Sequence, residues 1–286
     1  MVRILITGKY SYVGTSLEKW LGNFFGRYSI DTISLRDGSW KKKDFSMYNV
    51  VFHVAGIAHI KETKKNEKLY YEVNRDLAYD VATKAKSDGV KQFVFLSSMS
   101  VYGMESGVIN KKSTPNPQTN YGKSKLQAEE LINSLDGEGF KIATIRPPMI
   151  YGRKCKGNYS KLSKLIMKVP IFPDIKNKRS MIYIDNLCEF IKLIIDNHSS
   201  GLFFPQNTEY VCTSELARNI AAVHKKKIWF TKIFNPFIKL IKTGTVQKIF
   251  GDLVYEKGMS QNKESYAIIS FHDSVNASES RENDEV

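Results

Sequence analysis

The sequence has only three cysteines, too few acidic residues to balance its basic ones, and no apolar run long enough to span a membrane. Cys155, Cys188 and Cys212 share no metal-ligand spacing and cannot all pair, which predicts a reducing compartment and no metal site. No basic-then-apolar leader precedes the first apolar run at residues 3–7. We therefore expect a cytoplasmic protein without integral membrane association.

The shortage of acidic residues leaves a net charge of +14, from 43 lysines and arginines against 29 aspartates and glutamates. The basic residues are scattered and form no recognised nucleic-acid motif, so we expect no nucleic-acid partner. A phosphate-rich small ligand or an anionic membrane surface accounts for the charge as well. Residues 225–250 interleave lysines with bulky apolar residues. For them we expect a core-facing pair of helices interrupted near Pro236, with contact to a membrane surface as the alternative.

The first 150 residues alternate between short apolar runs and stretches of helical spacing, and no internal repeat is evident. The pattern predicts strands at 3–7, 30–35, 50–55, 92–98 and 141–147, and helices at 14–25, 66–88 and 121–135. Nearly continuous apolar strands separated by helices are typical of a parallel sheet covered on both faces. The expected fold class is therefore α/β, with a Rossmann-type doubly wound parallel sheet.

The stretch ILITGKYSYVGTSLEKWL, residues 4–21, reads as a buried strand, a loop and the start of a helix. In a dinucleotide-binding turn, three glycines allow the tight turn, the close approach of the pyrophosphate and the packing of the helix. Gly8 and Gly14 hold the outer two positions, and Ser11 stands in the middle one, although serine resists the positive φ angles that glycine tolerates. The loop predicts a phosphate cradle, with an ordinary β-to-α turn as the alternative.

The residue that follows the second strand of such a fold distinguishes the two nicotinamide cofactors. An acidic side chain there binds the ribose 2′-hydroxyl of NAD, and an arginine accepts the 2′-phosphate of NADP. Arg36 follows the predicted strand and favours NADP(H), and a shift of one residue to Asp37 leaves NAD(H) possible.

After about residue 150 the pattern changes, because helices predicted at 158–168 and 185–197 alternate with short extended pieces. We expect residues 1–155 to form a dinucleotide-binding Rossmann domain, to which some later segments return. Residues 156–272 are then mainly a smaller α+β substrate-binding portion, and the polar residues 273–286 are a flexible tail.

Three side chains suggest the chemistry. Tyr121 and Lys125 are one helical turn apart in NYGKSK, so they share a helix face. A lysine ammonium near a phenol favours the phenolate, and we expect it to lower the pKa of Tyr121 from about 10. Ser98, at the end of the fourth predicted strand, would hydrogen-bond the same substrate oxygen. This set suits proton exchange during hydride transfer at an alcohol carbon.

The sequence resembles the extended short-chain dehydrogenase/reductases along nearly its whole length. The resemblance rests on the glycine loop, on NYGKSK and on VFHVAGIAH, VNRDLAYDVATKAKSDGVKQFVFLSS, SVYG, IRPPMIYG and RSMIYIDNL. Within this group of enzymes, the sequence is similar to the NAD-dependent epimerase/dehydratase family of nucleotide-sugar 4-epimerases and 4-keto reductases. The resemblance implies a nicotinamide cofactor, a UDP-sugar substrate and catalytic roles for Ser98, Tyr121 and Lys125. It also implies a homodimer, formed through helices such as 66–88 and 121–135.

The resemblance assigns further contacts, position by position. The implied cofactor contacts are Gly8, Ser11, Tyr12, Val13, Gly14, Arg36, Val54, Ala55, Gly56, Asn74, Ser97, Tyr121, Lys125 and Pro147. The implied substrate contacts are Ser98, Tyr121, Asn158 in KGNY and Arg179, whose guanidinium would suit a diphosphate. A helix cap is the alternative for Asn158, and a surface ion pair is the alternative for Arg179.

One departure from the family narrows the reaction. Members that eliminate water from the sugar carry an Asp-Glu pair directly after the catalytic Ser/Thr, where this sequence has Met99 and Ser100. Dehydration is therefore not expected, and two outcomes of C4 redox chemistry stay open in surface-polysaccharide precursor synthesis. One is a UDP-sugar 4-epimerase with tightly held NAD, and the other is a UDP-4-keto-6-deoxyhexose 4-reductase that consumes NADPH. A non-catalytic dinucleotide-binding regulator is the alternative from another class, although such a protein would be expected to lack the tyrosine or the lysine.

Overall fold

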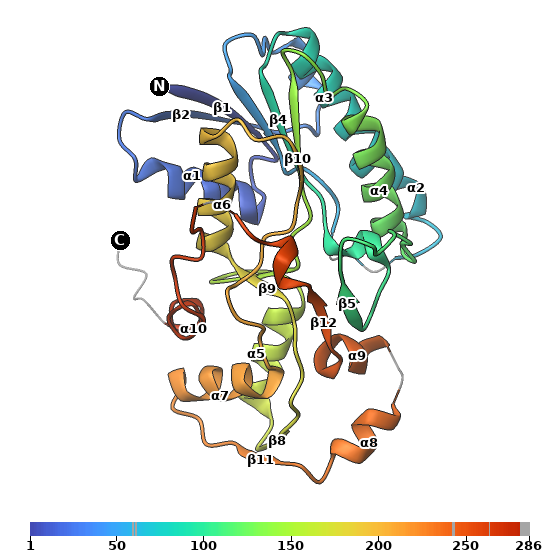
Figure 1. Cartoon of the computed structure of the whole chain (residues 1–286), viewed down its shortest axis with the longest axis vertical. Coiled ribbons are helices and arrows are strands. Elements are labelled where there is room, and N and C mark those ends of the chain that lie inside the picture. The colour runs from blue at the N-terminus through green and yellow to red at the C-terminus, as the bar shows by residue number, and fades with distance from the viewer. Residues whose placement is uncertain (59, 61, 242–243, 263, 281–286) are drawn as a thin grey trace.

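A six-stranded parallel sheet forms the centre of the upper half of the molecule (Figure 1). The computed structural model describes residues 1–58, 60, 62–241, 244–262 and 264–280. In spatial order the strands are β10 (Gly201–Phe203), β6 (Lys141–Ile145), β4 (Gln92–Leu96), β3 (Val50–His53), β1 (Val2–Thr7) and β2 (Tyr28–Ile33). Every pairing between these strands is parallel, which confirms the predicted fold class.

Helices cover both faces of this sheet (Figure 1). On one face α1 (Tyr12–Gly22) packs against α6 (Ile184–Asp196), and on the other α3 (Leu77–Ser87) packs against α4 (Asn120–Asn133). The short helix α2 (Glu67–Tyr71) and a π-helical turn, η2 (Glu72–Asp76), lead directly into α3. Because side chains alternate along a strand, Ile4 and Ile6 of β1 enter one core while Leu5 enters the other. The sheet is therefore doubly wound.

The strand order reverses next to β1. The chain passes from β1 through α1 to β2 on one side, then crosses through the 3₁₀ turn η1 (Ser39–Lys42) to β3 on the other side. In open α/β sheets such a reversal leaves a crevice outside the carboxyl ends of the two strands, and ligands bind there. Gly8 follows β1, and residues 54–56 follow β3.

The smaller portion occupies the lower half of Figure 1 and contains pairs of short parallel strands. The pairs are β5 (Gly107–Ile109) with β12 (Leu253–Tyr255), β7 (Met149–Tyr151) with β9 (Met181–Tyr183), and β8 (Ile171–Pro173) with β11 (Trp229–Thr231). The accompanying helices and 3₁₀ turns are η3 (Met99–Tyr102), α5 (Asn158–Lys168), α7 (Thr213–Val223), α8 (Asn235–Leu240), α9 (Gly244–Phe250) and η4 (Lys257–Met259). The chain leaves this portion at α6 and β10 to complete the sheet, and later comes back to it.

The prediction of a flexible tail is wrong for residues 273–279, because these residues belong to helix α10 (Phe271–Glu279). Ser274 is fully buried, and its hydroxyl lies 2.6 Å from that of Tyr151. Glu279 accepts a hydrogen bond from Ser163 and lies 2.8 Å from the ring Nε2 of His224. These tertiary contacts order a segment whose polar composition suggested fraying. Residues 281–286 lie outside the described residues.

For residues 225–250, the prediction of a core-facing pair of helices is wrong for α8 (Asn235–Leu240), because this helix exposes its large apolar side chains. Pro236 lies in the first turn of α8, where a backbone N–H has no partner within the helix. The proline therefore begins this helix and does not interrupt it. Phe230 of β11 packs on Phe172, but Phe237 and Leu240 of α8 are exposed. Residues 242 and 243, between α8 and α9, lie outside the described part of the chain. No helix among the described residues is both long and apolar enough to cross a bilayer.

Candidate active site

The loops that follow β1 and β3 meet at the reversal of strand order. Gly8 has a φ of +95°, and a Cβ atom there would lie 3.1 Å from the backbone of Ala55. A Cβ at Gly14 would lie 2.5 Å from the Ser11 hydroxyl and 3.2 Å from Val54. Both positions therefore require glycine, the first for its backbone angle and the second for its close approach.

Ser11 replaces the middle glycine without strain. It is the N-cap of α1, with φ −74° and ψ 143°, and its hydroxyl accepts a hydrogen bond from the Gly14 amide at 3.1 Å. The first turn of α1 then begins with the amides of Tyr12 and Val13, and a helix N-terminus favours a phosphate. The Tyr12 hydroxyl itself is buried close to Gly152, and burial raises its pKa. Tyr12 therefore has only its backbone available at this loop.

Asn74, fully buried in η2, fixes the loop after β3. Its side-chain oxygen accepts from the Ile57 amide at 2.7 Å, and its Nδ2 donates to the Ile57 carbonyl at 3.1 Å and to Ser124 at 3.2 Å. A Cβ at Gly56 would lie 3.0 Å from this oxygen and 3.6 Å from the Lys125 ammonium. Asn74 thus holds the backbone between the glycine loop and α4, and π-helical turns often occur at such functional positions.

Ser98, Tyr121 and Lys125 come together beyond the carboxyl end of β4, as the sequence predicts. Ser98 caps η3: its hydroxyl accepts from the Ser100 amide and donates to the Ser100 hydroxyl, both at 3.1 Å, and it lies close enough to Tyr121 to lower the pKa of that phenol. Lys125, one turn further along α4, donates from Nζ to the Leu96 carbonyl at 2.8 Å. Two hydroxyls and an ammonium thus surround the end of one strand.

Two residues hold the start of α4 and therefore Tyr121. Thr119 is the N-cap and accepts from the Gly122 amide at 3.1 Å. The Glu62 carboxylate accepts from the amides of Asn120 and Tyr121, each at 3.1 Å, where a negative charge is favourable. Glu62 was not predicted, because it lies far from α4 in the sequence and outside every recognised motif.

The protonation of this set differs from the prediction. Burial raises the pKa of Tyr121, and the hydrogen bond with Ser98 opposes that shift only partly. Burial also lowers the pKa of Lys125 to about 8, against the opposing effect of Glu129. The expected lowering of the Tyr121 pKa is therefore wrong for this structure, because the ammonium donates to a backbone carbonyl and lies 4.6 Å above the Phe95 ring.

A buried ion pair behind Lys125 was also missed. Glu129, one turn after Lys125, binds Arg146 through Nε at 3.0 Å and Nη2 at 2.5 Å, and Arg146 donates to the Tyr102 hydroxyl at 2.9 Å. Ser97 donates to the same carboxylate, so only the acceptor side of its hydroxyl remains for the predicted cofactor contact. The sequence signal was the spacing of Tyr121, Lys125 and Glu129 at intervals of four residues along one helix face.

The remaining predicted residues are more scattered. The Pro147 carbonyl accepts from the Met99 amide at 2.9 Å and so lies beside the Ser98 turn, while Arg36 is exposed after β2. Asn158 is the exposed first residue of α5, after Gly157 as N-cap. Arg179 is buried and donates to the carbonyls of Gln247 (3.2 Å) and Gly251 (2.9 Å) at the end of α9. Among the described residues, no hydrogen bond links Asn158 or Arg179 to the catalytic candidates, and their substrate roles stay predictions.

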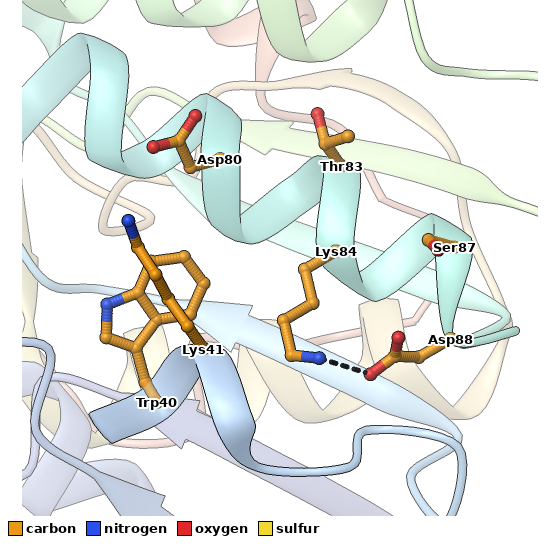
Figure 2. Close-up of a pocket in the computed structure, with 7 residues that line it drawn as sticks. All are labelled: Trp40, Lys41, Asp80, Thr83, Lys84, Ser87 and Asp88. Carbon is orange, nitrogen blue, oxygen red and sulfur yellow. Dashed lines mark hydrogen bonds and ion pairs between the residues drawn. The ribbon is translucent and has the colours of Figure 1, made fainter. Parts of the chain in front are cut away.

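A shallow surface hollow of about 460 Å³ lies between η1 and α3 (Figure 2). Lys84 and Asp88, two of the residues that line it, form an ion pair of 2.8 Å. Its lining residues are Trp40, Lys41, Asp80, Thr83, Lys84, Ser87 and Asp88. None of them belongs to the predicted site, so we assign this hollow no part in the chemistry.

Comparison with known proteins agrees with this geometry. The model of the NAD dependent epimerase/dehydratase family matches residues 4–204, from β1 through β10. The chain belongs to the NAD dependent epimerase/dehydratase family. The matched range of the family contains the glycine loop, Ser98, Tyr121 and Lys125.

Two relatives in the family differ in what their names say they act on. The UDP-glucose 4-epimerase of Vibrio cholerae is 29% identical over 293 residues, which cover 92% of this chain and 89% of that protein. The N-acetyl-alpha-D-glucosaminyl-diphospho-ditrans,octacis-undecaprenol 4-epimerase of Escherichia coli O157:H7 is 34% identical over 138 residues. That match covers 46% of this chain and 42% of the E. coli protein.

Solved structures share the fold along nearly the whole chain. The UDP-glucuronic acid 4-epimerase from Bacillus cereus, in complex with NAD, has a TM-score of 0.74 at 18% identity and covers 97% of each chain. The dTDP-4-dehydrorhamnose reductase from Bacillus anthracis, in complex with NADP, has a TM-score of 0.71 at 18% identity, over 97% of this chain and 98% of that one. Known members of this fold thus bind either nicotinamide dinucleotide.

The epimerase/dehydratase site of this chain fits such a dinucleotide. A cradle that only glycine permits lies at the first turn of α1, directly against the loop after β3. The Lys125 ammonium lies 3.6 Å from where a Cβ on Gly56 would be, so the loop after β3 reaches from the glycine cradle to α4.

Proposed function

We propose that this protein catalyses hydride transfer at C4 of a UDP-hexose as an NAD(P)-dependent 4-epimerase. The observation that carries the proposal is the placement of Ser98 and Lys125 at the carboxyl end of β4, with Tyr121 one turn before Lys125 on α4 and close enough to Ser98 for that hydroxyl to lower its pKa. Such a set can hold one sugar oxygen and exchange its proton, which a change of configuration at C4 requires.

Each residue has a separate role in this proposal. A bound nicotinamide ring supplies the hydride chemistry at the carbon. Tyr121, as the phenolate, would take the proton from the 4-hydroxyl as the hydride leaves C4, and the resulting phenol would give that proton back when the hydride returns, while Ser98 hydrogen-bonds the same oxygen. Lys125 gives up its bond to the Leu96 carbonyl and stabilises the phenolate, because an adjacent cation lowers a phenol pKa. Glu129 keeps Lys125 protonated by raising its pKa.

A UDP-4-keto-6-deoxyhexose 4-reductase is the second candidate, and Arg36 favours it. The exposed guanidinium after β2 can pair with the 2′-phosphate of NADP. If it does, Arg36→Ala weakens NADPH binding more than NADH binding in titrations of nucleotide fluorescence. Equal losses for both nucleotides would remove the argument for NADP(H) and for the reductase.

The carrier of the sugar is a further choice. We propose UDP, in line with the Vibrio cholerae relative, which matches almost the whole chain. A polyprenol diphosphate is the second candidate carrier. The Escherichia coli relative is named for one, and α8, which lies in a lysine-rich segment, exposes large apolar side chains.

Incubation with defined substrates tests the proposal. UDP-glucose, UDP-GlcNAc, undecaprenyl-diphosphate-linked GlcNAc and a UDP-4-keto-6-deoxy sugar are each supplied with and without NADPH. Formation of the 4-epimer without added NADPH supports the epimerase, and the productive substrate identifies the carrier. NADPH consumption with the keto sugar alone supports the reductase. Dinucleotide binding without turnover of any of the four would support a regulator instead. Dimerisation through α3 and α4 stays a separate prediction.

A further inference from the structure

An exposed apolar face runs from the edge of the β8–β11 pair onto α8, at the bottom of Figure 1. We define the α8 face as Ile171, Trp229, Ile233, Phe234, Phe237, Leu240 and Ile241. The most exposed are Leu240 (78%), Trp229 (75%), Ile233 (74%) and Phe237 (65%). A contiguous group of large apolar side chains facing water marks a binding surface.

The local structure explains why these side chains point outward. In β11, Phe230 faces the core, so Trp229 faces the other way and lies beside its strand partner Ile171. Phe237 and Leu240, three residues apart, lie on the same side of α8, and Ile233 lies in the turn that precedes the helix. Hydrogen bonds fix the joint between strand and helix, from the Ile233 amide to Thr231 Oγ1 and from Asn235 to the Asp174 carbonyl.

The charge within the segment that forms most of the α8 face has one sign. Residues 225–250 contain seven lysines and no acidic residue, and Lys225, Lys227 and Lys232 are exposed. The neighbouring carboxylate of Asp174 is already paired with Arg218 at 2.8 Å. The face therefore combines a tryptophan, phenylalanines and aliphatic side chains with a basic surround.

We propose that the α8 face docks the protein on an anionic phospholipid bilayer. Aromatic and aliphatic side chains enter the boundary between headgroups and acyl chains, and lysines pair with the anionic headgroups. A second copy of the chain fits less well, because pairing the same face of two copies would bring their lysines together. Nucleic acid fits less well because isoleucine and leucine do not stack on bases.

An ion pair connects the helix after α8 to the segment that follows the η3 turn of the candidate active site. α9 follows α8, and Lys248 of α9 pairs with Glu105 at 3.8 Å, shortly after the η3 turn that Ser98 caps. Membrane docking goes beyond the proposed reaction and holds for either carrier, since it concerns where the enzyme acts.

Sedimentation with lipid vesicles tests this proposal and needs no substrate. The full chain should sediment with vesicles that contain phosphatidylglycerol and much less with phosphatidylcholine alone, and high salt should weaken the binding. Trp40 is buried and Trp20 is hydrogen-bonded to Glu189, so the exposed Trp229 should supply a blue shift in tryptophan emission on binding. Trp229→Phe should abolish the shift and retain most of the sedimentation.

Matched variants separate docking from general stickiness. Phe237→Asp and Leu240→Asp should each lower vesicle partitioning about tenfold or more, since each removes an apolar side chain that the bilayer would bury in the bound state. Lys232→Glu should also lower it, by about tenfold. The controls Phe25→Asp, at a 96% exposed residue between α1 and β2, and Lys91→Glu should bind like the wild type. Unchanged melting temperatures verify that each variant is folded.

Three results would overturn the proposal. The first is no sedimentation with anionic vesicles, and the second is equal loss of binding in the control variants. The third is a dimer, seen by light scattering without lipid, that Phe237→Asp converts to a monomer. That last result would assign the α8 face to an interface between copies of the chain.

Discussion

At the scale of single residues, the chemistry depends on where three polar groups direct their hydrogen bonds. Ser98 donates to the Ser100 hydroxyl, and Lys125 donates to the Leu96 carbonyl rather than to the Tyr121 phenol. Burial alone would make the phenol a poor base at neutral pH, since it raises the Tyr121 pKa. On the proposed function, we therefore expect Lys125 to turn from the carbonyl toward the phenol during the reaction.

Removal of the Tyr121 hydroxyl gives the most direct test at this scale. Tyr121→Phe should lower kcat about 10²- to 10⁴-fold, because the proton donor and acceptor is lost while the ring still packs. Steady-state kinetics measure the loss, and dinucleotide titration should show binding close to wild type. The matched control is Tyr79→Phe on α3, which should retain full turnover. Wild-type turnover in Tyr121→Phe would disprove the assignment.

At the scale of elements, the end of β4 and the helix α4 are joined by buried polar contacts. Glu129 of α4 holds Arg146, just beyond β6, and also affects the protonation of Lys125. Sequence periodicity predicted both strands and the helix, because their apolar spacing is regular. It missed the Glu129–Arg146 pair, because an isolated glutamate on a helix is far more often solvated.

Neutralising Glu129 should affect both stability and pH dependence. Glu129→Gln leaves the buried Arg146 charge without its carboxylate partner and should cost about 3–5 kcal/mol of the free energy of unfolding. Loss of the carboxylate also lowers the Lys125 pKa further below about 8, so the alkaline limb of the kcat/KM profile should move to lower pH.

An exposed ion pair gives the matched control for this variant. Glu72→Gln breaks the surface pair of Lys68 with Glu72 and should change stability by less than about 1 kcal/mol. Denaturant unfolding and pH–rate profiles of both variants provide the measurements. A Glu129→Gln protein with the stability and pH profile of the wild type would show that Glu129 has no positioning role.

At the scale of the whole molecule, stability should depend on one histidine beneath the candidate site. His53, at the end of β3, is fully buried between Phe93 and Phe95, with its Nδ1 3.0 Å from Thr7 Oγ1. Burial lowers its pKa to about 3, with a smaller effect from the nearby Lys125 charge. The folded protein thus keeps this ring neutral at every pH at which the unfolded chain would titrate it.

The sign of the pH effect follows from this difference. The unfolded chain binds a proton at His53 below about pH 6.5 and the folded protein does not, so stability is lost as pH falls from about 6.5 toward 3. The loss from this residue approaches about 1.4 kcal/mol per pH unit within that range. His53→Phe should therefore show a smaller fall in melting temperature between neutral and mildly acidic pH than the wild type. Identical pH dependence in the two proteins would contradict this account.

The sequence by itself determined the alternation of strands and helices, the glycine loop and the spacing of Tyr121 with Lys125. These are local patterns, set by periodicity, backbone sterics and short-range capping. Only the tertiary structure decided what the distant residues do, because their partners are far away in the chain. In the fold, Glu62 hydrogen-bonds the start of α4, Glu129 pairs with Arg146, and Asn74 hydrogen-bonds the loop after β3. It also ordered α10 through buried contacts and left the α8 face exposed, since neither composition nor periodicity specifies which apolar surface finds a partner.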